Sequence, residues 1–377
     1  MGWNVICFLS VSMQGCLIFL FVIMNTPYHP TQFAPIVLFV YNRPFETQRT
    51  LNALKLNTYA QQSDLYIYSE NADLHADVQT VKDVFQVRKM ISNVTGFKSV
   101  RVIEWERHMG LAHSIINGTS EVLQKHGRVI VLEDDLITSP NFLSYINQTL
   151  DYYEGNRQVM SVTGFSFKVN VPSDYEYDTY FTRRLCTYGW GTWLDRWETV
   201  DWEVKDYNSF KWNPIALFRF MRGGQDLPRM LSAYMKGKLR AWSIRFCYHQ
   251  FKTNTYTVYP TQSKIDNIGY NAKGTNTTRR KRFDTVLFQP SDNHSFHLAK
   301  DVFLNRSINR SFLKKYTIVN RIIANYFDWA NMETWRNIPK QIARWFSWVS
   351  SIFVSDIELR FPEAYSSSRL RVDAERI

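Results

Sequence analysis

Cysteine is scarce in this sequence, with four residues in 377. No pair has the C-x-x-C spacing of a zinc site, and the four are spread widely along the chain: Cys7, Cys16, Cys186 and Cys247. A cysteine-based zinc site and a disulfide framework are therefore unsupported. The usage fits a reducing compartment.

Signatures of nucleic-acid binding are also missing. The formal net charge is +11, which suits nucleic acid, anionic lipid or a phosphate-bearing substrate as a partner. The sequence has no zinc-finger spacing, no RNA-recognition signature and no basic helix followed by heptads. Its densest basic run, 279–282, is typical of a solvated loop. We therefore expect no nucleic acid, and keep a phosphate-bearing substrate and a membrane surface as partners.

Charged residues are absent before Arg43, and residues 3–24 are largely apolar. This stretch is long enough to span a bilayer, but it lacks the basic n-region of a signal peptide. Three interpretations stay open for residues 1–33: a membrane anchor, a buried helix, or an upstream extension with initiation at Met24. The basic excess downstream predicts a protein in the cytoplasm or on the cytoplasmic face of the inner membrane.

Between residues 34 and 153, strand and helix patterns alternate. Four short apolar runs rich in β-branched residues predict buried parallel strands, and stretches of helical spacing lie between them. This alternation is typical of an α/β fold with a doubly wound, mostly parallel sheet. The strands are predicted at 35–41, 64–70, 99–105 and 128–136, and the helices at 47–56, 78–92, 111–126 and 139–152.

The alternation fails after Met160, and Gly and Trp become frequent through 189–212. We expect a mixed region there that builds an acceptor pocket, within a catalytic domain spanning residues 34–300. A helical C-terminal extension with a loose tail is predicted for 301–377. Its segment 340–353 is amphipathic and either packs on the domain or lies on a membrane surface.

Three adjacent carboxylates, Glu133, Asp134 and Asp135, stand at the end of the fourth predicted strand. Ligands of open α/β sheets bind beyond the carboxyl ends of the strands. Adjacent carboxylates repel one another, and a divalent cation such as Mg²⁺ or Mn²⁺ relieves that repulsion. Such a metal also stabilises the charge of a nucleotide leaving group. The alternative is a solvated acidic turn before a helix N-terminus.

Several stretches of the chain match a known pattern, and together they span roughly residues 34–276. The longest and most specific is GLAHSIINGTSEVLQKHGRVIVLEDDLITSPNFLSYINQTLDYY. Three others are VLFVYNRP, LYIYSENAD and YGWGTWLDRWETVDW, and a weaker fifth is SKIDNIGYNAKGTN. In these the chain resembles nucleotide-diphospho-sugar transferases of the GT-A type. More narrowly, it resembles N-acetylglucosaminyltransferase I-like proteins and bacterial transferases of surface-polysaccharide pathways.

The resemblance implies a donor site. Arg43 would contact the nucleotide diphosphate, and Glu70 would lie where an acidic residue binds the base. Asp135 would be the direct metal ligand, while Glu133 and Asp134 would hold the sugar and ribose hydroxyls. The alternatives are a surface arginine beside a turn for Arg43 and an ordinary strand-end carboxylate for Glu70.

The resemblance also implies a floor and a lid for the donor sugar. Gly189 and Trp190 would form the floor, although Trp190 also fits a plain core position. The segment 267–276 would be a mobile loop that closes over the donor, with Gly269 and Gly274 suited to a hinge.

The chain departs from the pattern at the general base. Animal enzymes of that family carry a Trp-Asp-Asp-Trp-like stretch, and the nearest match here, 241–245, has no carboxylate. An inverting transfer needs a base within about 2.6–3.2 Å of the acceptor hydroxyl. We expect Asp226 in this role, because it precedes the helix that carries Trp242. The other candidates are Glu198, Asp195 and Asp201.

The predicted function is a metal-assisted, inverting glycosyltransferase. Its donor would be a nucleotide sugar, UDP-linked by resemblance, and its acceptor a glycan or lipid-linked hydroxyl in surface-polysaccharide or glycan biosynthesis. A nucleotidyltransferase is one alternative, but it would need a Gly-rich basic loop where NRPFETQ stands. A membrane-associated binding or scaffold protein without catalysis is another, favoured by the missing base. A basic polyanion binder is a third.

Overall fold

The computed structural model describes residues 10–13, 16–19, 30, 32–269 and 295–317. Two short strands near the N-terminus pair antiparallel in a sheet of their own, β1 (Ser10–Met13) and β2 (Cys16–Phe19). Residues 1–9, 14–15, 20–29 and 31 of the predicted anchor or extension, and the amphipathic segment 340–353, lie outside the described residues.

Strands and helices alternate through the first half of the body, as predicted. They are β3 (Ile36–Val40), α1 (Pro44–Lys55), η1 (Ala60–Gln62), β4 (Asp64–Ser69), α2 (Val78–Ile91), β5 (Ser99–Glu104), α3 (Leu111–His126), β6 (Arg128–Glu133), β7 (Leu136–Thr138) and α4 (Phe142–Tyr153).

The second half is mixed, also as predicted. Its elements are β8 (Val159–Thr163), β9 (Thr179–Thr182), β10 (Trp190–Trp193), α5 (Leu194–Trp197), α6 (Tyr207–Phe210), α7 (Pro214–Phe220), η2 (Met221–Gly223), α8 (Leu227–Met235), α9 (Ser243–Thr253), β11 (Tyr256–Pro260), β12 (Ile265–Asn267) and α10 (Arg306–Lys314).

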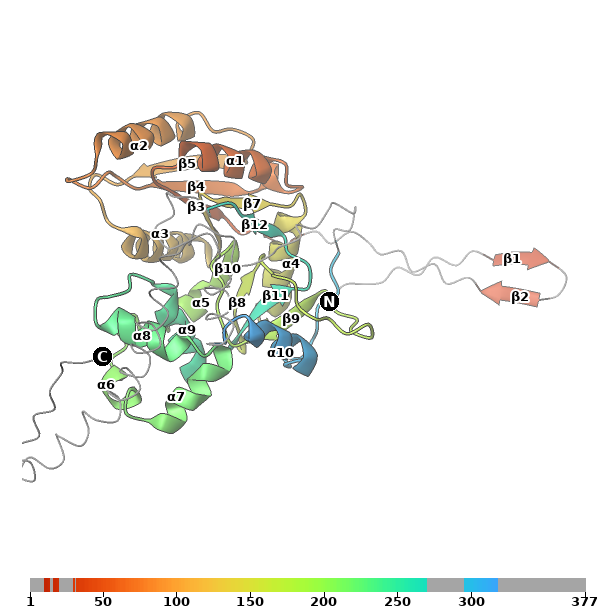
Figure 1. Ribbon diagram of the computed structural model, residues 1–377. Helices are drawn as coiled ribbons and strands as arrows, with labels where there is room; N and C mark the ends of the chain where they lie inside the picture. The colour runs from red at the N-terminus through yellow and green to blue at the C-terminus, as the bar shows by residue number, and fades with distance from the viewer. Residues whose placement is uncertain (1–9, 14–15, 20–29, 31, 270–294, 318–377) are drawn as a thin grey trace, which may run out of the picture.

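Eight strands form the main sheet, in the order β5-β4-β3-β6-β10-β8-β11-β9 (Figure 1). The first four are mutually parallel, β8 and β11 are parallel to each other, and β10 and β9 run antiparallel to their neighbours. The predicted α/β class with a mostly parallel sheet is confirmed. The predicted fourth strand is shorter than expected, because β7 leaves the main sheet and pairs with β12.

Alternate residues of β3 divide the core into two layers. Ile36 and Leu38 face one hydrophobic cluster with α1, α2 and α4, whereas Val37 and Phe39 face another with α3, α5 and α9. Helices thus cover both faces of the sheet, which explains why β3 is apolar at every position.

Local sequence signals set several helix ends. Pro44 opens α1 in the first turn, where its missing N–H costs nothing. The Asp77 side chain caps α2 by accepting from the Thr80 N–H at 2.7 Å. Gly127 ends α3 in the left-handed conformation, with φ of 76°. Among the described residues, no helix combines the length and apolar character needed to cross a membrane.

Candidate active site

The carboxyl ends of β3, β4 and β6 bring the predicted donor-side residues to one edge of the sheet. The α1 connection leaves β3 on one face, and the α3 connection reaches β6 on the other, so the chain changes direction between β3 and β6. Ligands of open α/β sheets bind at such a switch point. Arg43 follows β3 at this point, and the acidic triplet ends β6.

Arg43 binds two carboxylates of the triplet. Its Nη1 donates to Asp135 Oδ2 at 2.8 Å and lies 3.3 Å from Asp134 Oδ1. Burial, and then the two neighbouring carboxylates, raise the pKa of Glu133 to about 8. Burial also raises the pKa of Asp134 to about 7 and raises that of Asp135, although Arg43 opposes both shifts. One guanidinium therefore faces three carboxylates, and the site is short of positive charge.

The backbone around Asp134 is held in place by α1 and β3. The Thr50 hydroxyl donates to the Asp134 carbonyl at 2.9 Å, and the Tyr41 N–H donates to Asp134 Oδ2 at 3.3 Å. These contacts turn the chain sharply between β6 and β7, so the carboxylates stay at the edge of the sheet.

Asp135 lies directly against the start of the predicted closing loop. The Ile268 N–H donates to the Asp135 carbonyl at 2.9 Å. A Cβ added at Gly269 would lie 2.0 Å from Asp135 Oδ2, so only glycine leaves room for this carboxylate. Gly274 and the rest of the loop lie outside the described residues.

The triplet has the ligand chemistry of a site for a hard divalent cation. Burial and the neighbouring carboxylates raise the pKa values of Glu133 and Asp134, and all three side chains offer the oxygen ligands that Mg²⁺ and Mn²⁺ prefer. Within the described ranges, no group of three or more His, Cys, Asp or Glu side chains is arranged to hold a metal ion. Metals that handle nucleotides often take one or two carboxylates and complete their shell with phosphate and water. A single protein ligand is enough under those conditions.

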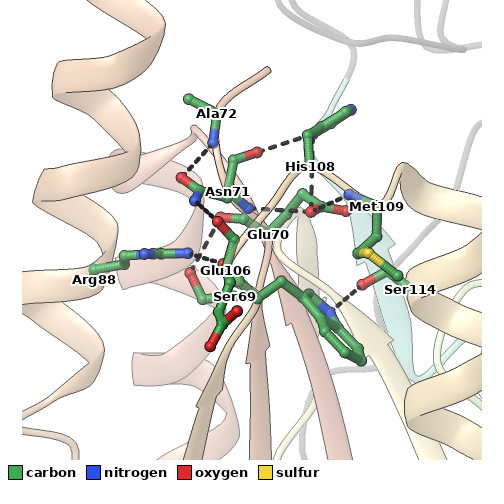
Figure 2. A network of polar contacts seen from close by, with 10 residues as sticks. Ser69, Glu70, Asn71, Ala72, Arg88, Glu106, His108, Met109 and Ser114 are labelled. Carbon is green, nitrogen blue, oxygen red and sulfur yellow. Dashed lines mark hydrogen bonds and ion pairs between the residues drawn. The ribbon is translucent and has the colours of Figure 1, made fainter. Parts of the chain in front are cut away.

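Glu70, at the end of β4, is 6% exposed and anchors a network of polar contacts (Figure 2). Its Oε1 accepts from the Asn71 N–H at 3.1 Å and from the Met109 N–H at 2.8 Å. Its Oε2 is buried and has no partner within the part of the chain that the structure describes. A buried carboxylate oxygen without a donor is costly, and a bound N–H or O–H would relieve that cost.

His108 and Met109 are site residues that the sequence did not reveal. His108 Nδ1 lies 2.9 Å from the Asn71 carbonyl oxygen and 3.8 Å from Glu70 Oε1. The His108 ring lies 5.6 Å from the Tyr41 ring, which joins this network to the acidic triplet. A surface pocket of about 260 Å³ opens beside it, lined by Arg107, His108, Met109 and His113. The sequence signal for a turn beside these residues is Gly110, because its positive φ of 79° is a backbone conformation that favours glycine.

The predicted sugar floor is wrong for Trp190. This side chain is 1% exposed, and its ring lies 5.7 Å from Trp197 and 5.2 Å from Trp242 in the core. Gly189 is buried as well, and a Cβ there would lie 2.7 Å from Ile265 Cδ1. Both residues therefore contribute to packing, because aromatic side chains of α5 and α9 cover Trp190 and Ile265 lies against Gly189.

Asp226, the favoured base, is held in a buried ion pair. The two carboxylate oxygens accept from Arg184 Nη1 at 2.8 Å and Nη2 at 3.1 Å, and Asp226 is 4% exposed. Both oxygens of the carboxylate are therefore engaged by the guanidinium. This buried ion pair argues against the predicted role of Asp226 as general base.

Glu198 and Asp195 lie at the opposite edge of the sheet from the triplet. Because β10 runs antiparallel to β6, Trp193 pairs with Arg128 at the start of β6, and α5 begins there. Glu198 is exposed at the end of α5, and Asp195 is paired with Arg196 at 2.7 Å. The position of Glu198 argues against its predicted catalytic role. Of the other candidates, Asp201 caps a turn by accepting backbone N–H groups.

No protein-family model and no curated protein matches the chain. Among solved structures, it is similar to the mannosyltransferase PcManGT from Pyrobaculum calidifontis in complex with GDP-Man and Mn²⁺, at 12% identity and a TM-score of 0.33, over 60% of this chain and 74% of that one. It is also similar to TarS from S. aureus, at 10% identity and a TM-score of 0.33, over 62% of this chain and 60% of that one.

A third similar structure is glucosyl-3-phosphoglycerate synthase from Mycobacterium tuberculosis, in complex with Mn²⁺, UDP and glucosyl-3-phosphoglycerate. Its identity is 12% and its TM-score 0.23, over 36% of this chain and 44% of that one.

Proposed function

We propose that this protein is a glycosyltransferase of the GT-A type that uses a nucleotide-sugar donor. The observation that carries the proposal is the pairing of two unsatisfied features along one sheet edge. Three carboxylates face one arginine at the end of β6, and at the end of β4 a buried Glu70 oxygen has no donor among the described residues. These strands are separated by β3 alone, hence by about 10 Å, a span suited to a nucleoside diphosphate.

The residues of this edge divide the work of binding and activating the donor. Arg43 would bind the diphosphate, and Glu133 and Asp134 would accept hydrogen bonds from the sugar and ribose hydroxyls. A Mn²⁺ or Mg²⁺ on Asp135 would neutralise charge on the leaving diphosphate. Transfer would then be a direct displacement with inversion, and retention in the product would contradict this version.

The Glu70 network favours a uracil base over guanine. Uracil presents one N–H between two carbonyl groups, whereas guanine presents two adjacent N–H donors that need both oxygens of a carboxylate. Oε1 already accepts from two backbone N–H groups, so only Oε2 can accept from a base. This supports a UDP-linked donor.

The acceptor is proposed to be a hydroxyl of a glycan or a lipid-linked saccharide in surface-polysaccharide or glycan biosynthesis. The net charge of +11 and the apolar N-terminal stretch support membrane association on a cytoplasmic face.

A nucleotide-sugar-binding protein without catalysis is a second candidate. It is favoured by the positions of Asp226 and Glu198, because neither carboxylate lies at the donor edge in a form that could accept a proton.

Donor binding and turnover separate these candidates. UDP or a UDP-sugar with Mn²⁺ should raise the melting temperature, since a ligand at about 100 times its Kd adds roughly 2.7 kcal/mol to the free energy of unfolding. Asp135→Asn should abolish the shift, whereas the matched variant Asp64→Asn, at the other end of β4, should retain it. Release of UDP from a UDP-sugar identifies an enzyme, and binding without release identifies the second candidate. A folded protein that binds no nucleotide would refute both.

A further inference from the structure

The α7 helix carries apolar side chains on two sides. Phe220 is buried, with its ring 5.7 Å from that of Phe210. Ile215 and Phe218, three residues apart and therefore on one side of the helix, are 70% and 71% exposed. Trp212, three residues earlier, is also exposed. A helix that is apolar all round is normally covered, so the outward side has the character of a docking surface.

A cluster of arginines continues this outward side. Arg219 follows Ile215 by four residues on α7, Arg222 lies in the next element, η2, and both are exposed. Burial lowers the pKa of Arg183, Tyr256 opposes this shift, and the positive charges of Arg222 and Arg219 add to it. In the described part of the chain, neither Arg219 nor Arg222 forms an ion pair.

The surrounding segment has almost no negative charge to balance these arginines. Residues 207–240 contain seven Lys and Arg against one acid, Asp226. That acid is bound by Arg184, and the acid that precedes the segment, Asp206, is bound by Lys252. The outward side of α7 therefore combines exposed apolar groups with uncompensated positive charge.

We propose that this side of α7 docks on the surface of an anionic lipid bilayer. The apolar side chains would enter the boundary between headgroups and acyl chains, and the guanidinium groups would bind headgroup phosphates. Tryptophan is favoured at that boundary. A nucleic acid or soluble polyanion would use the arginines but leave the aliphatic and aromatic groups exposed. The α7 patch consists of Arg183, Trp212, Ile215, Phe218, Arg219 and Arg222.

Docking through the α7 patch leaves the donor edge open. Arg183 donates to the Tyr256 hydroxyl at 2.8 Å, at the start of β11, whereas the acidic triplet lies at the carboxyl ends of the strands. The α7 helix also lies at the end of the molecule away from α1 and α2 (Figure 1). The inference does not depend on catalysis, since lipid binding can be measured without a donor.

Another occupant would be the chain's own segment 340–353. That segment carries Lys340 and Arg344 and no acid, so its charge matches that of the patch rather than complementing it. If it covered the patch, the intact chain would not bind vesicles through these residues.

Cosedimentation of the full chain with vesicles tests the proposal. Vesicles of equal parts phosphatidylglycerol and phosphatidylcholine should bind the protein, and pure phosphatidylcholine should not. Arg219→Glu with Arg222→Glu should weaken binding at least about 25-fold, since each basic residue near an anionic surface contributes about fivefold. Phe218→Ser should weaken vesicle binding about tenfold, because the bilayer would no longer bury this aromatic side chain.

Matched controls lie on α2. Phe85 is 70% exposed, so Phe85→Ser makes the same change on a helix at the other end of the molecule. Lys82→Glu with Lys89→Glu repeats the charge change on exposed residues. Both controls should bind as the wild type does, and far-UV circular dichroism checks each fold. If Phe218→Ser unfolds the chain, Ile215→Ser replaces it.

Three outcomes overturn the proposal. The first is a wild type that does not prefer anionic vesicles. The second is equal loss in the α2 controls. The third is loss with the arginine changes but none with Phe218→Ser or Ile215→Ser, which would indicate a polyanion surface instead.

Discussion

Two buried acidic sites of this molecule differ in how their charge is balanced. At the donor edge, Glu133, Asp134 and Asp135 share one arginine, and their pKa values are raised. In the second half, Asp226 has Arg184 to itself, with two hydrogen bonds in bidentate geometry. The first site lacks positive charge, which a ligand can supply, whereas the charges of the second site are balanced.

This difference shows how to separate function from structure when both sites are buried and acidic. The charges of a matched ion pair satisfy each other within the fold, whereas a buried surplus of one charge is characteristic of places where something binds or reacts. The unpaired Oε2 of Glu70 belongs to the same class as the triplet.

Breaking the balanced pair should have the largest effect. Asp226→Ala leaves the Arg184 guanidinium buried without a partner, so the free energy of unfolding should fall by roughly 3–5 kcal/mol. Urea denaturation measures this loss, and Mn²⁺ with UDP should not restore it. Arg184→Met combined with Asp226→Leu should recover most of the stability. A loss of donor turnover in a fully stable Asp226→Asn variant would instead reinstate this residue as the base.

Removing a charge from the unbalanced site should have the opposite sign. Asp135→Asn relieves repulsion in the triplet, so the metal-free chain should unfold no more easily than the wild type and gain up to about 1 kcal/mol. Mn²⁺-dependent UDP affinity, measured by calorimetry, should meanwhile fall by on the order of 100-fold, because the first metal ligand is lost. Destabilisation comparable to that of Asp226→Ala would mean that the triplet is structural.

Crowding the unbalanced site should have an intermediate effect. A methyl group at Gly269 must displace the Asp135 carboxylate, which lies 2.0 Å from the position of a Cβ. Gly269→Ala should weaken Mn²⁺-dependent UDP binding about tenfold, in the range seen when groups that orient a metal ligand are changed. Gly155→Ala is the matched control, since nothing lies within 4 Å of a Cβ there. Equal affinity in the two variants would show that Asp135 need not keep its present position.

The strands and helices of residues 34–153, and the edge that carries the triplet, follow from local sequence. An apolar run such as 36–40 predicts a strand whatever its place in the sheet. Adjacent carboxylates after such a run predict an acidic edge of the sheet. The sequence could not place Glu198, because the direction of β10 relative to β6 is a tertiary property. Nor could it identify Arg184 as the partner of Asp226, 42 residues further along the chain.

The pH dependence of stability should reveal the surplus charge with the smallest effect. The raised pKa values, about 7 for Asp134 and about 8 for Glu133, mean that the folded chain holds protons that the unfolded chain releases near pH 4. Without metal, the free energy of unfolding should therefore fall as pH rises toward 8. Between pH 7 and 8 the loss is on the order of 1 kcal/mol.

Two histidines have the opposite effect at lower pH. Burial lowers the pKa of His126 and His249, so their contribution to the free energy of unfolding rises with pH until the same histidines are deprotonated in the unfolded chain. Comparison with Glu133→Gln removes that background, and the variant should show a shallower decline above pH 7. Mn²⁺ with UDP should reverse the slope, since the metal takes the place of the protons and binds more tightly as they leave. Parallel pH profiles for the wild type and the variant would place Glu133 with the balanced carboxylates of the second half.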